Sequence, residues 1–306
     1  MVAVVAPSPA PPSVTRPVPV ARVSAPPLQR AISLVLAILS AGILVIVVVL
    51  VAVSPVQHYA TQNQLYEQVR LSLAEGSTPV QPVTDAGEPV RVGTPVAVMY
   101  APDIGIRREV VVEGSAGAQT MLGIGHQRNT VLPCQLGTSV LMARSSSYGA
   151  VGAAWADLRV GQTFTVQAGQ GSCTYKVRDR RLAGDDAPPA LTAGEGRVVL
   201  TTATGGWYTP TGVLRVDADL VTKGFDRPAQ LGMPVSEAER PMGTDPTNAF
   251  GLVLLLELLA AAVIGATWLW RRWGRWQTWI VAAPVIGVVA LLAATTVNQI
   301  VLPNLL

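Results

Sequence analysis

Three long apolar runs dominate the pattern of hydrophobic and polar positions along the chain. They cover residues 31–53, 249–270 and 278–297, and Glu257 is the one charged residue inside them. A helix needs about 20 apolar residues to cross the hydrocarbon core of a membrane, so each run is long enough. We therefore predict three transmembrane helices, at residues 31–53, 249–270 and 278–302. The first is expected to stay as an anchor, because it exceeds the length of a signal-peptide core.

Basic residues next to these runs predict the orientation of the chain. Arg16, Arg22 and Arg30 precede the first run, and a basic turn at 271–277 joins the other two. Such clusters stay on the cytoplasmic side of a membrane. We therefore expect a cytoplasmic N-terminus in a plasma membrane, with residues 55–247 on the extracytoplasmic side.

The segments around the first run differ in character. Residues 1–30 are rich in Pro, Ala and Val without periodicity, which indicates a disordered cytoplasmic tail. Residues 54–92 begin with a helical pattern, which Gly76 ends, and continue as a Pro-rich linker. An imperfect apolar stripe marks that juxtamembrane helix and consists of Leu65, Val69, Leu71 and Leu73.

Short runs typical of strands follow from Pro95 onward, punctuated by glycine, proline and polar residues. They lie at 96–100, 109–113, 138–142, 163–167, 174–178, 197–201 and 213–220. Short strands at this spacing, with little helix between them, predict one barrel or sandwich. The sequence therefore predicts a mainly β domain at 93–221, joined to the second apolar run by a polar linker at 222–248.

Composition supports this division. Half of the residues are hydrophobic and 13% are charged, whereas soluble domains carry about 25% charged residues. The net charge of +3 comes from the cytoplasmic clusters: residues 55–247 hold 22 − 6 = 16 basic and 19 − 1 = 18 acidic residues. This charge distribution argues against a nucleic-acid partner.

The β domain resembles the sortases, especially those of actinobacteria with an N-terminal anchor. Gly125-His126, Thr130-Val-Leu-Pro and Gly137-Thr-Ser-Val-Leu-Met resemble the family's "GH…TxLPG…GNxVIAGH" stretch, and 199–203 lies where the family carries TLxTC. The resemblance implies a closed, eight-stranded β-barrel ectodomain beside the three transmembrane α-helices. Active members cleave a sorting signal through a thioacyl intermediate, which requires a cysteine, a histidine and an arginine.

Carried over residue by residue, the resemblance leaves the catalytic set incomplete. Ala203 occupies the nucleophile position, and Arg144 occupies the position of the catalytic histidine. Val213 occupies the arginine position, with Arg215 two residues further along the same strand face. We expect Arg144, Thr202, Ala203 and Arg215 to line a binding groove that lacks catalytic residues.

The two cysteines leave three alternatives open. Cys134 and Cys173 lie in the part of the chain expected in an oxidising compartment, which favours a disulfide. Two free thiols are the second alternative, and a displaced nucleophile at Cys134 is the third.

The remaining polar candidates do not form a ligand set. His126 matches the family's upstream, non-catalytic histidine, and His58 follows the first apolar run. Asp185, Asp186, Glu109 and Glu113 evoke calcium, but solvated surface is the favoured interpretation. We expect neither a metal nor another cofactor.

Glu257 is costly inside a membrane and calls for a partner. Thr295 or Thr296 on the third apolar run could supply it, or a second protein could.

Together these observations favour a catalytically silent sortase-like membrane protein that binds a peptide or surface-protein partner at the cell surface. An adaptor role in surface-protein or pilus assembly fits this interpretation. An active cysteine transpeptidase with displaced residues and a structural subunit of a membrane complex are the alternatives.

Overall fold

The computed structural model describes residues 26–83, 87–227 and 234–306. The chain divides into two units, residues 1–41 and 42–306, and the second contains all the strands. Most of the predicted tail lies outside the described residues, but helix α1 begins at Pro27 rather than after residue 30. Proline is favoured at the first position of a helix, which explains this earlier start.

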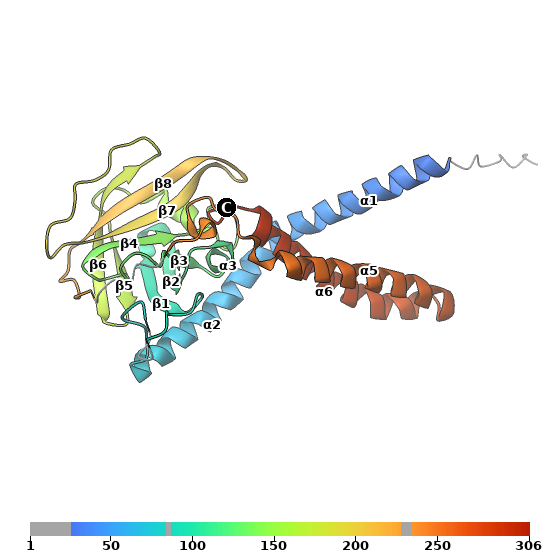
Figure 1. Cartoon of the computed structure of the whole chain (residues 1–306), viewed down its shortest axis with the longest axis horizontal. Helices are drawn as coiled ribbons and strands as arrows, with labels where there is room; N and C mark the ends of the chain where they lie inside the picture. Colours follow the sequence, from blue (N-terminus) through green and yellow to red (C-terminus); the bar gives the residue numbers. More distant parts are fainter. Residues whose placement is uncertain (1–25, 84–86, 228–233) are drawn as a thin grey trace, which may run out of the picture. The chain divides into compact units, whose positions relative to one another are not determined.

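The eight strands form a closed barrel, shown in Figure 1. Its spatial order is β1-β2-β3-β4-β7-β8-β6-β5, with β5 returning to pair with β1. Two pairs, β2–β3 and β4–β7, are parallel, and the others are antiparallel. The strand bounds are β1 (Pro95–Ala101), β2 (Ile106–Glu113), β3 (Ile124–His126), β4 (Gly137–Met142), β5 (Thr163–Ala168), β6 (Gly171–Arg181), β7 (Gly196–Gly206) and β8 (Thr209–Leu220).

The helices are of two kinds, short ones in the loops and connections of the chain and long ones before and after the strands. The short ones are η2 (Pro102–Ile104), α3 (Gly117–Thr120), α4 (Val151–Trp155), η3 (Glu237–Glu239) and η4 (Pro246–Asn248). The long ones are α1 (Pro27–Val48), α2 (Ser54–Glu75), α5 (Ala249–Arg272) and α6 (Arg275–Val301).

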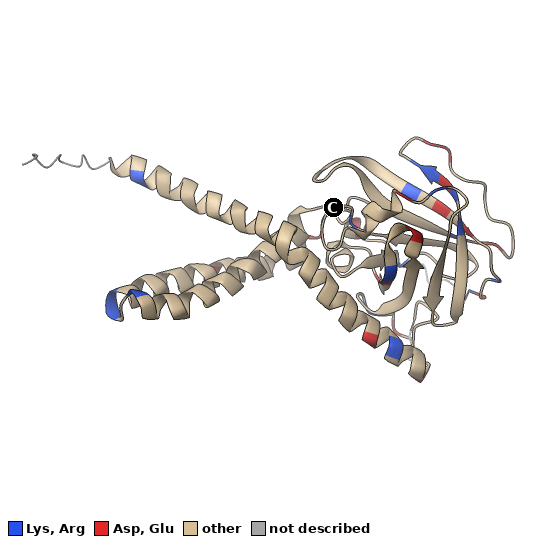
Figure 2. Ribbon diagram, turned by 180° about the vertical axis from the view of Figure 1, so that it is seen from behind, with Lys and Arg blue, Asp and Glu red and all other residues tan. Residues whose placement is uncertain are grey.

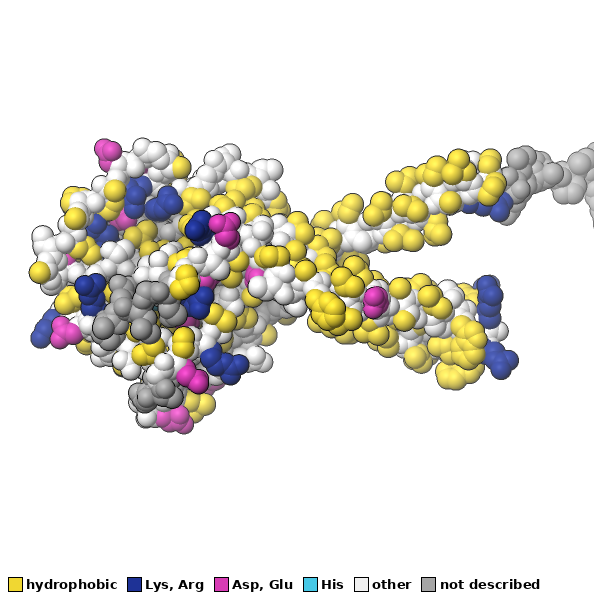
Figure 3. All heavy atoms as spheres, in the orientation of Figure 1, with side chains coloured by type: hydrophobic (Ala, Val, Ile, Leu, Met, Phe, Trp, Pro, Cys, Tyr) yellow, Lys and Arg dark blue, Asp and Glu magenta, His cyan; other side chains and the backbone are white. Residues whose placement is uncertain are grey.

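Three helical segments are long and apolar enough to cross a membrane: Pro27–Glu75, Pro246–Arg272 and Arg275–Val301. Helices α5 and α6 pack on each other as a hairpin. Hydrophobic side chains cover most of the hairpin face seen in Figure 3. The ribbon is coloured for basic residues at the hairpin turn in Figure 2, where Arg271, Arg272 and Arg275 lie. The mainly β barrel with three apolar helices is therefore confirmed.

The first apolar run and the juxtamembrane helix form one continuous helical segment rather than two helices. Between α1 and α2 lies the π-helical turn η1 (Val49–Val53), where the Ser54 N–H donates to the Val49 carbonyl. A proline removes a helical N–H and its ring needs space, and a wide turn supplies that space. Pro55, the second residue of α2, is therefore accommodated without a break in the helical path.

Helix α2 packs on the barrel through part of the predicted stripe. Leu65 and Val69 are buried against β1 and β2, and Leu73 packs beside them. Leu71 is 61% exposed. The face that packs on the barrel therefore consists of residues four positions apart, Leu65, Val69 and Leu73. Leu71 does not belong to it and points away from the barrel.

A disulfide joins Cys134 to Cys173, with Cα atoms 5.6 Å apart. Cys134 has φ of 73°, a left-handed backbone conformation that normally favours glycine. The Tyr175 hydroxyl accepts a hydrogen bond from the Cys134 N–H, and the disulfide holds the side chain in the core. These bonds keep the loop before β4 in its strained conformation.

We predict that replacing both cysteines by alanine lowers the free energy of unfolding by about 4 kcal/mol, because the bridge closes a loop of 39 residues. Chemical denaturation of the detergent-solubilised chain, followed by near-UV circular dichroism, measures this change. The reduced unaltered chain is the control and should unfold at the same denaturant concentration as the variant. An unchanged midpoint would contradict the prediction.

Candidate functional site

The nucleophile position predicted from the resemblance lies on one face of strands β7 and β8. Ala203 pairs with Val213 across the strands, and Thr201 pairs with Arg215. Side chains alternate along a strand, so Ala203, Val213 and Arg215 share a face. Ala203 is buried there in an apolar cluster with Met142, Leu305 and Leu306. We call this set the Ala203 cluster.

Arg144 lies just beyond strand β4 and is 1% exposed. One Nη atom donates to the Gly117 carbonyl at 3.1 Å, and the guanidinium lies over the Tyr148 ring at 5.4 Å. The Nε and the other Nη atom have no hydrogen-bond partner among the described residues. Burial lowers the pKa of Arg144 to about 10, although Tyr148, Tyr208 and Asp245 raise it in opposition.

The other two predicted groove residues differ in their placement. Arg215 is partly exposed on the face of Ala203. Thr202 is buried, and its hydroxyl occupies the space that a Cβ on Gly152 of helix α4 would need. Since Thr202 therefore faces α4 and alternates with Ala203 along β7, it does not share the face of the Ala203 cluster.

The 302–306 segment, which follows α6, packs against the barrel at the Ala203 cluster, a contact that the sequence analysis did not predict. Asn304 is fully buried, and Leu305 and Leu306 are 0% and 4% exposed. The Leu305 carbonyl accepts hydrogen bonds from the Ser145 N–H and hydroxyl, at 2.9 and 3.1 Å. Ser147 donates to the Leu306 oxygen at 2.5 Å. The signal available in the sequence was a Pro-Asn pair directly after an apolar run.

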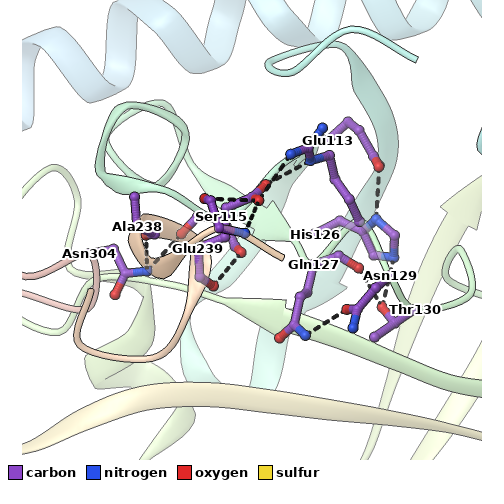
Figure 4. A network of polar contacts seen from close by, with 11 residues as sticks. Glu113, Ser115, His126, Gln127, Asn129, Thr130, Ala238, Glu239 and Asn304 are labelled. Atoms are coloured by element: carbon purple, nitrogen blue, oxygen red, sulfur yellow. Dashed lines mark hydrogen bonds and ion pairs between the residues drawn. The ribbon is translucent and has the colours of Figure 1, made fainter. Parts of the chain in front are cut away.

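Asn304 anchors this segment, as Figure 4 shows. Its side-chain amide nitrogen donates to the carbonyls of Ser115, Ala238 and Arg240, at 2.8 to 3.1 Å. Its backbone N–H donates to the Gly243 carbonyl at 2.8 Å. The segment is therefore held by main-chain acceptors from two parts of the chain.

A second buried polar pair lies beside this anchor. The His126 ring donates from Nδ1 to Glu113 at 2.8 Å, and Nε2 lies 2.9 Å from the Val131 carbonyl. Burial by itself lowers the pKa of His126. The Glu113 carboxylate and the Val131 carbonyl have the larger combined effect, so the pKa is raised. With an acceptor at each nitrogen, His126 supports the structure as a buried cation.

The favoured interpretation of Glu109 and Glu113 as solvated surface is wrong. Both are buried, and each faces a histidine, because α2 and β3 cover the strand that carries them. His58 Nε2 lies 3.2 Å from the Glu109 carboxylate, and burial raises the pKa of Glu109. Asp185 and Asp186 are exposed as expected. The described residues contain no group of three or more potential metal ligands.

Glu257 is exposed on α5. The Thr295 and Thr296 hydroxyls donate to carbonyls of their own helix, Leu291 and Leu292. The predicted pairing within the hairpin is therefore not formed.

The chain resembles known proteins at the level of fold. No family model and no curated protein matches it. Among solved structures, a Clostridium perfringens sortase D5 transpeptidase matches at 18% identity over 53% of this chain and 99% of its own, with a TM-score of 0.44. A Streptococcus agalactiae sortase C1 matches at 20% identity over 53% and 89%, with a TM-score of 0.38.

The chain's structural neighbours are sortases. The sortase C-1 of Actinomyces oris is another, at 22% identity over 42% of this chain and 75% of its own, with a TM-score of 0.35. At these identities the similarity concerns the fold alone.

We predict that Arg144→Met stabilises the protein by roughly 1–2 kcal/mol. Burial lowers the pKa of Arg144 from its usual range to about 10, which corresponds to a cost of roughly 3 kcal/mol for the buried charge. The lost hydrogen bond and ring contact offset about half of this. Denaturant unfolding measures the change, and Arg215→Met, at a partly exposed position, is the matched control. A clear loss of stability in Arg144→Met would contradict the prediction.

We also predict a pH dependence that His126 controls. Its raised pKa means that the stabilisation is complete below the unfolded value of about 6.5 and is lost as the pH rises through the folded value. The unfolding midpoint of the unaltered chain should therefore fall as the pH is raised above about 6.5. In His126→Gln that fall should be reduced, and an identical pH profile in both proteins would count against the assignment.

Proposed function

We propose that this protein is a catalytically silent, sortase-like membrane protein whose barrel binds a peptide or protein partner at the cell surface. An adaptor role in surface-protein or pilus assembly is the specific form that we favour. The observation that carries the proposal is the pair of residues at the two reactive positions, Arg144 and Ala203.

Neither residue can perform the required chemistry. A thioacyl intermediate needs a thiolate, and the Ala203 methyl group offers no nucleophilic atom. The leaving amine needs a proton donor whose pKa lies near the working pH. Burial lowers the pKa of Arg144 only to about 10, so its guanidinium remains protonated near neutral pH. An apolar cluster and a fixed cation therefore stand in place of a nucleophile and an acid.

The cysteines also argue against a displaced nucleophile. Both sulfur atoms belong to the Cys134–Cys173 disulfide, and both residues are buried in the barrel core. A sulfur in a disulfide cannot attack a peptide carbonyl without prior reduction. This supports the silent protein over the active transpeptidase.

The hairpin supports our proposed orientation in the membrane. Arg271, Arg272 and Arg275 lie at the turn between α5 and α6, whereas the 302–306 segment contacts the barrel. With the basic turn on the cytoplasmic side, both outer ends of the hairpin lie on the side of the barrel. The N-terminus is then cytoplasmic and the barrel extracytoplasmic.

A structural subunit of a membrane complex is the second candidate, and Glu257 favours it. The carboxylate is exposed on an apolar helix that has no buried residues. An unpaired carboxylate at membrane depth is expensive, so a second protein would supply its partner. If Glu257→Gln abolishes co-purification of a partner from native membranes while Arg215→Gln does not, the hairpin rather than the barrel carries the interaction.

We predict that the purified chain neither cleaves nor transfers LPxTG-like peptides. Loss of a nucleophile and its acid–base partner typically lowers the rate by about 10⁶-fold. Ala203→Cys alone should restore little, because the Arg144 guanidinium does not release a proton to the leaving amine near neutral pH. Mass spectrometry of peptide and amine acceptor after prolonged incubation measures both reactions.

The double variant Ala203→Cys, Arg144→His is the informative comparison. Measurable turnover in this variant alone would support a sortase site that has lost its reactive groups. Robust turnover by the unaltered chain, abolished by Cys134→Ser, would overturn the proposal.

A further inference from the structure

We infer that the barrel face around Ala203 carries a binding site for an Asn-Leu-Leu peptide segment, and that the 302–306 segment fills this site within the same chain. A partner peptide with the same pattern of side chains would bind there by displacing it. The inference deepens the proposed function and rests on it for the role of the partner.

The first part of this site selects an amide side chain. Three carbonyl oxygens, from Ser115, Ala238 and Arg240, converge on the side-chain nitrogen of Asn304. Carbonyl oxygens only accept hydrogen bonds, so the site fits an NH₂ group and repels a carboxylate of the same shape. The Ser115 hydroxyl donates to the main-chain carbonyl of Glu239, and Arg128 donates to its carboxylate. These bonds hold η3 in place, and with it the neighbouring carbonyls of Ala238 and Arg240.

The second part of the site takes two apolar side chains. Leu305 and Leu306 are buried with Met142 and Ala203, and Val140, Val213 and Met242 pack at the edge. Small or apolar side chains on β4, β7 and β8 therefore form a surface that covers two leucines.

Main-chain bonds between these two parts fix the position of the peptide. Ser145 holds the Leu305 carbonyl through two donors, and Gly243 accepts from the Asn304 N–H. Such bonds do not depend on side-chain identity, so they provide affinity while the amide and leucine positions provide specificity.

The attachment of the segment to α6 sets how strongly it competes for the site. It follows directly after α6, which ends at Val301, and the Leu302 N–H still donates to the Asn298 carbonyl. A segment held next to its site has a high effective concentration, so a partner must compete with it. Movement of the outer end of α6 would change that competition, which couples the site to the hairpin.

Accessibility of a cysteine introduced at position 203 tests occupancy. In the full chain carrying Ala203→Cys, solubilised in detergent, a water-soluble maleimide should react slowly, because Leu305 and Leu306 cover the position. Adding Asn304→Asp should raise the rate about tenfold or more, since the carboxylate has no N–H to donate and faces three carbonyl oxygens. Asn248→Asp, the same change at an exposed asparagine, should leave the rate unchanged.

Added peptide tests whether the site is separable. An acetylated, amidated peptide with the sequence of residues 300–306 should protect the introduced thiol in the Asn304→Asp variant. The same peptide with aspartate in place of asparagine should not. Protection also shows that the variant is folded, because only the intact site recognises the peptide.

A cross-link gives an independent measurement in a chain that keeps Asn304. The pair Ser147→Cys and Leu306→Cys should form a disulfide, and excess peptide should lower its yield. The pair Ser147→Cys and Ser77→Cys is the control and should not cross-link. The Tyr148 N–H donates to the Ser54 hydroxyl at the start of α2, so Ser147 lies near that end of the helix. Ser77 follows the opposite end, roughly 30 Å along the helix from Ser54. These two results hold whether or not Asn304→Asp folds.

Two outcomes would overturn the inference. Rapid labelling of Ala203→Cys in the otherwise unaltered chain would show that the segment does not cover the site. A cross-link yield unaffected by peptide would show that the segment is fixed structure rather than a displaceable ligand. Both leave the proposed absence of catalysis intact, because that part of the proposal is tested separately, by whether the unaltered chain cleaves or transfers peptide.

Discussion

Parallel pairing of β4 with β7 organises both the barrel and the candidate site. The register runs from Gly137 opposite Gly196 to Met142 opposite Thr201. Parallel neighbours require a long crossover, and here the crossover contains α4, β5 and β6, which close the barrel against β1. The same pairing brings Arg144 and Ala203, which are distant in sequence, to adjacent strand ends.

Buried polar groups in this region are compensated in different ways. Each buried glutamate beneath α2 and β3 lies beside a histidine, although burial still raises the pKa of Glu109. Arginine–carboxylate pairs compensate the charges along β6, β7 and β8. Arg144 differs from these, because its charge is buried with one hydrogen bond and an aromatic ring. A buried cation with so few partners costs stability.

The sequence predicted the strands and the apolar helices well for physical reasons. Valine-rich, β-branched runs bounded by glycine and proline have a strong local preference, and an apolar run of about 20 residues is typical of a membrane span. Strand β3, with three residues, is too short to show periodicity. The burial of Glu109 and Glu113 was missed because it depends on α2 and β3 covering them from elsewhere in the sequence.

The candidate site was predictable only in part. Position 203 and position 144 followed from collinear motifs, whereas their contacts did not. The 302–306 segment escaped prediction because its burial depends on carbonyls distant in sequence, such as that of Ala238, 66 positions from Asn304. Thr202 was assigned to the groove by adjacency in sequence, but alternation along β7 places it on the other face.

The π-helical turn η1 also sets the rotational phase of α2. Each residue advances an α-helix by about 100°, so the number of residues between Val53 and Leu65 fixes which side of the helix meets the barrel. One residue more or less in that interval would turn Leu65 and Val69 about 100° away from β1 and β2. Insertions and deletions before Leu65 should therefore be far less tolerated than substitutions on the outer side of the helix.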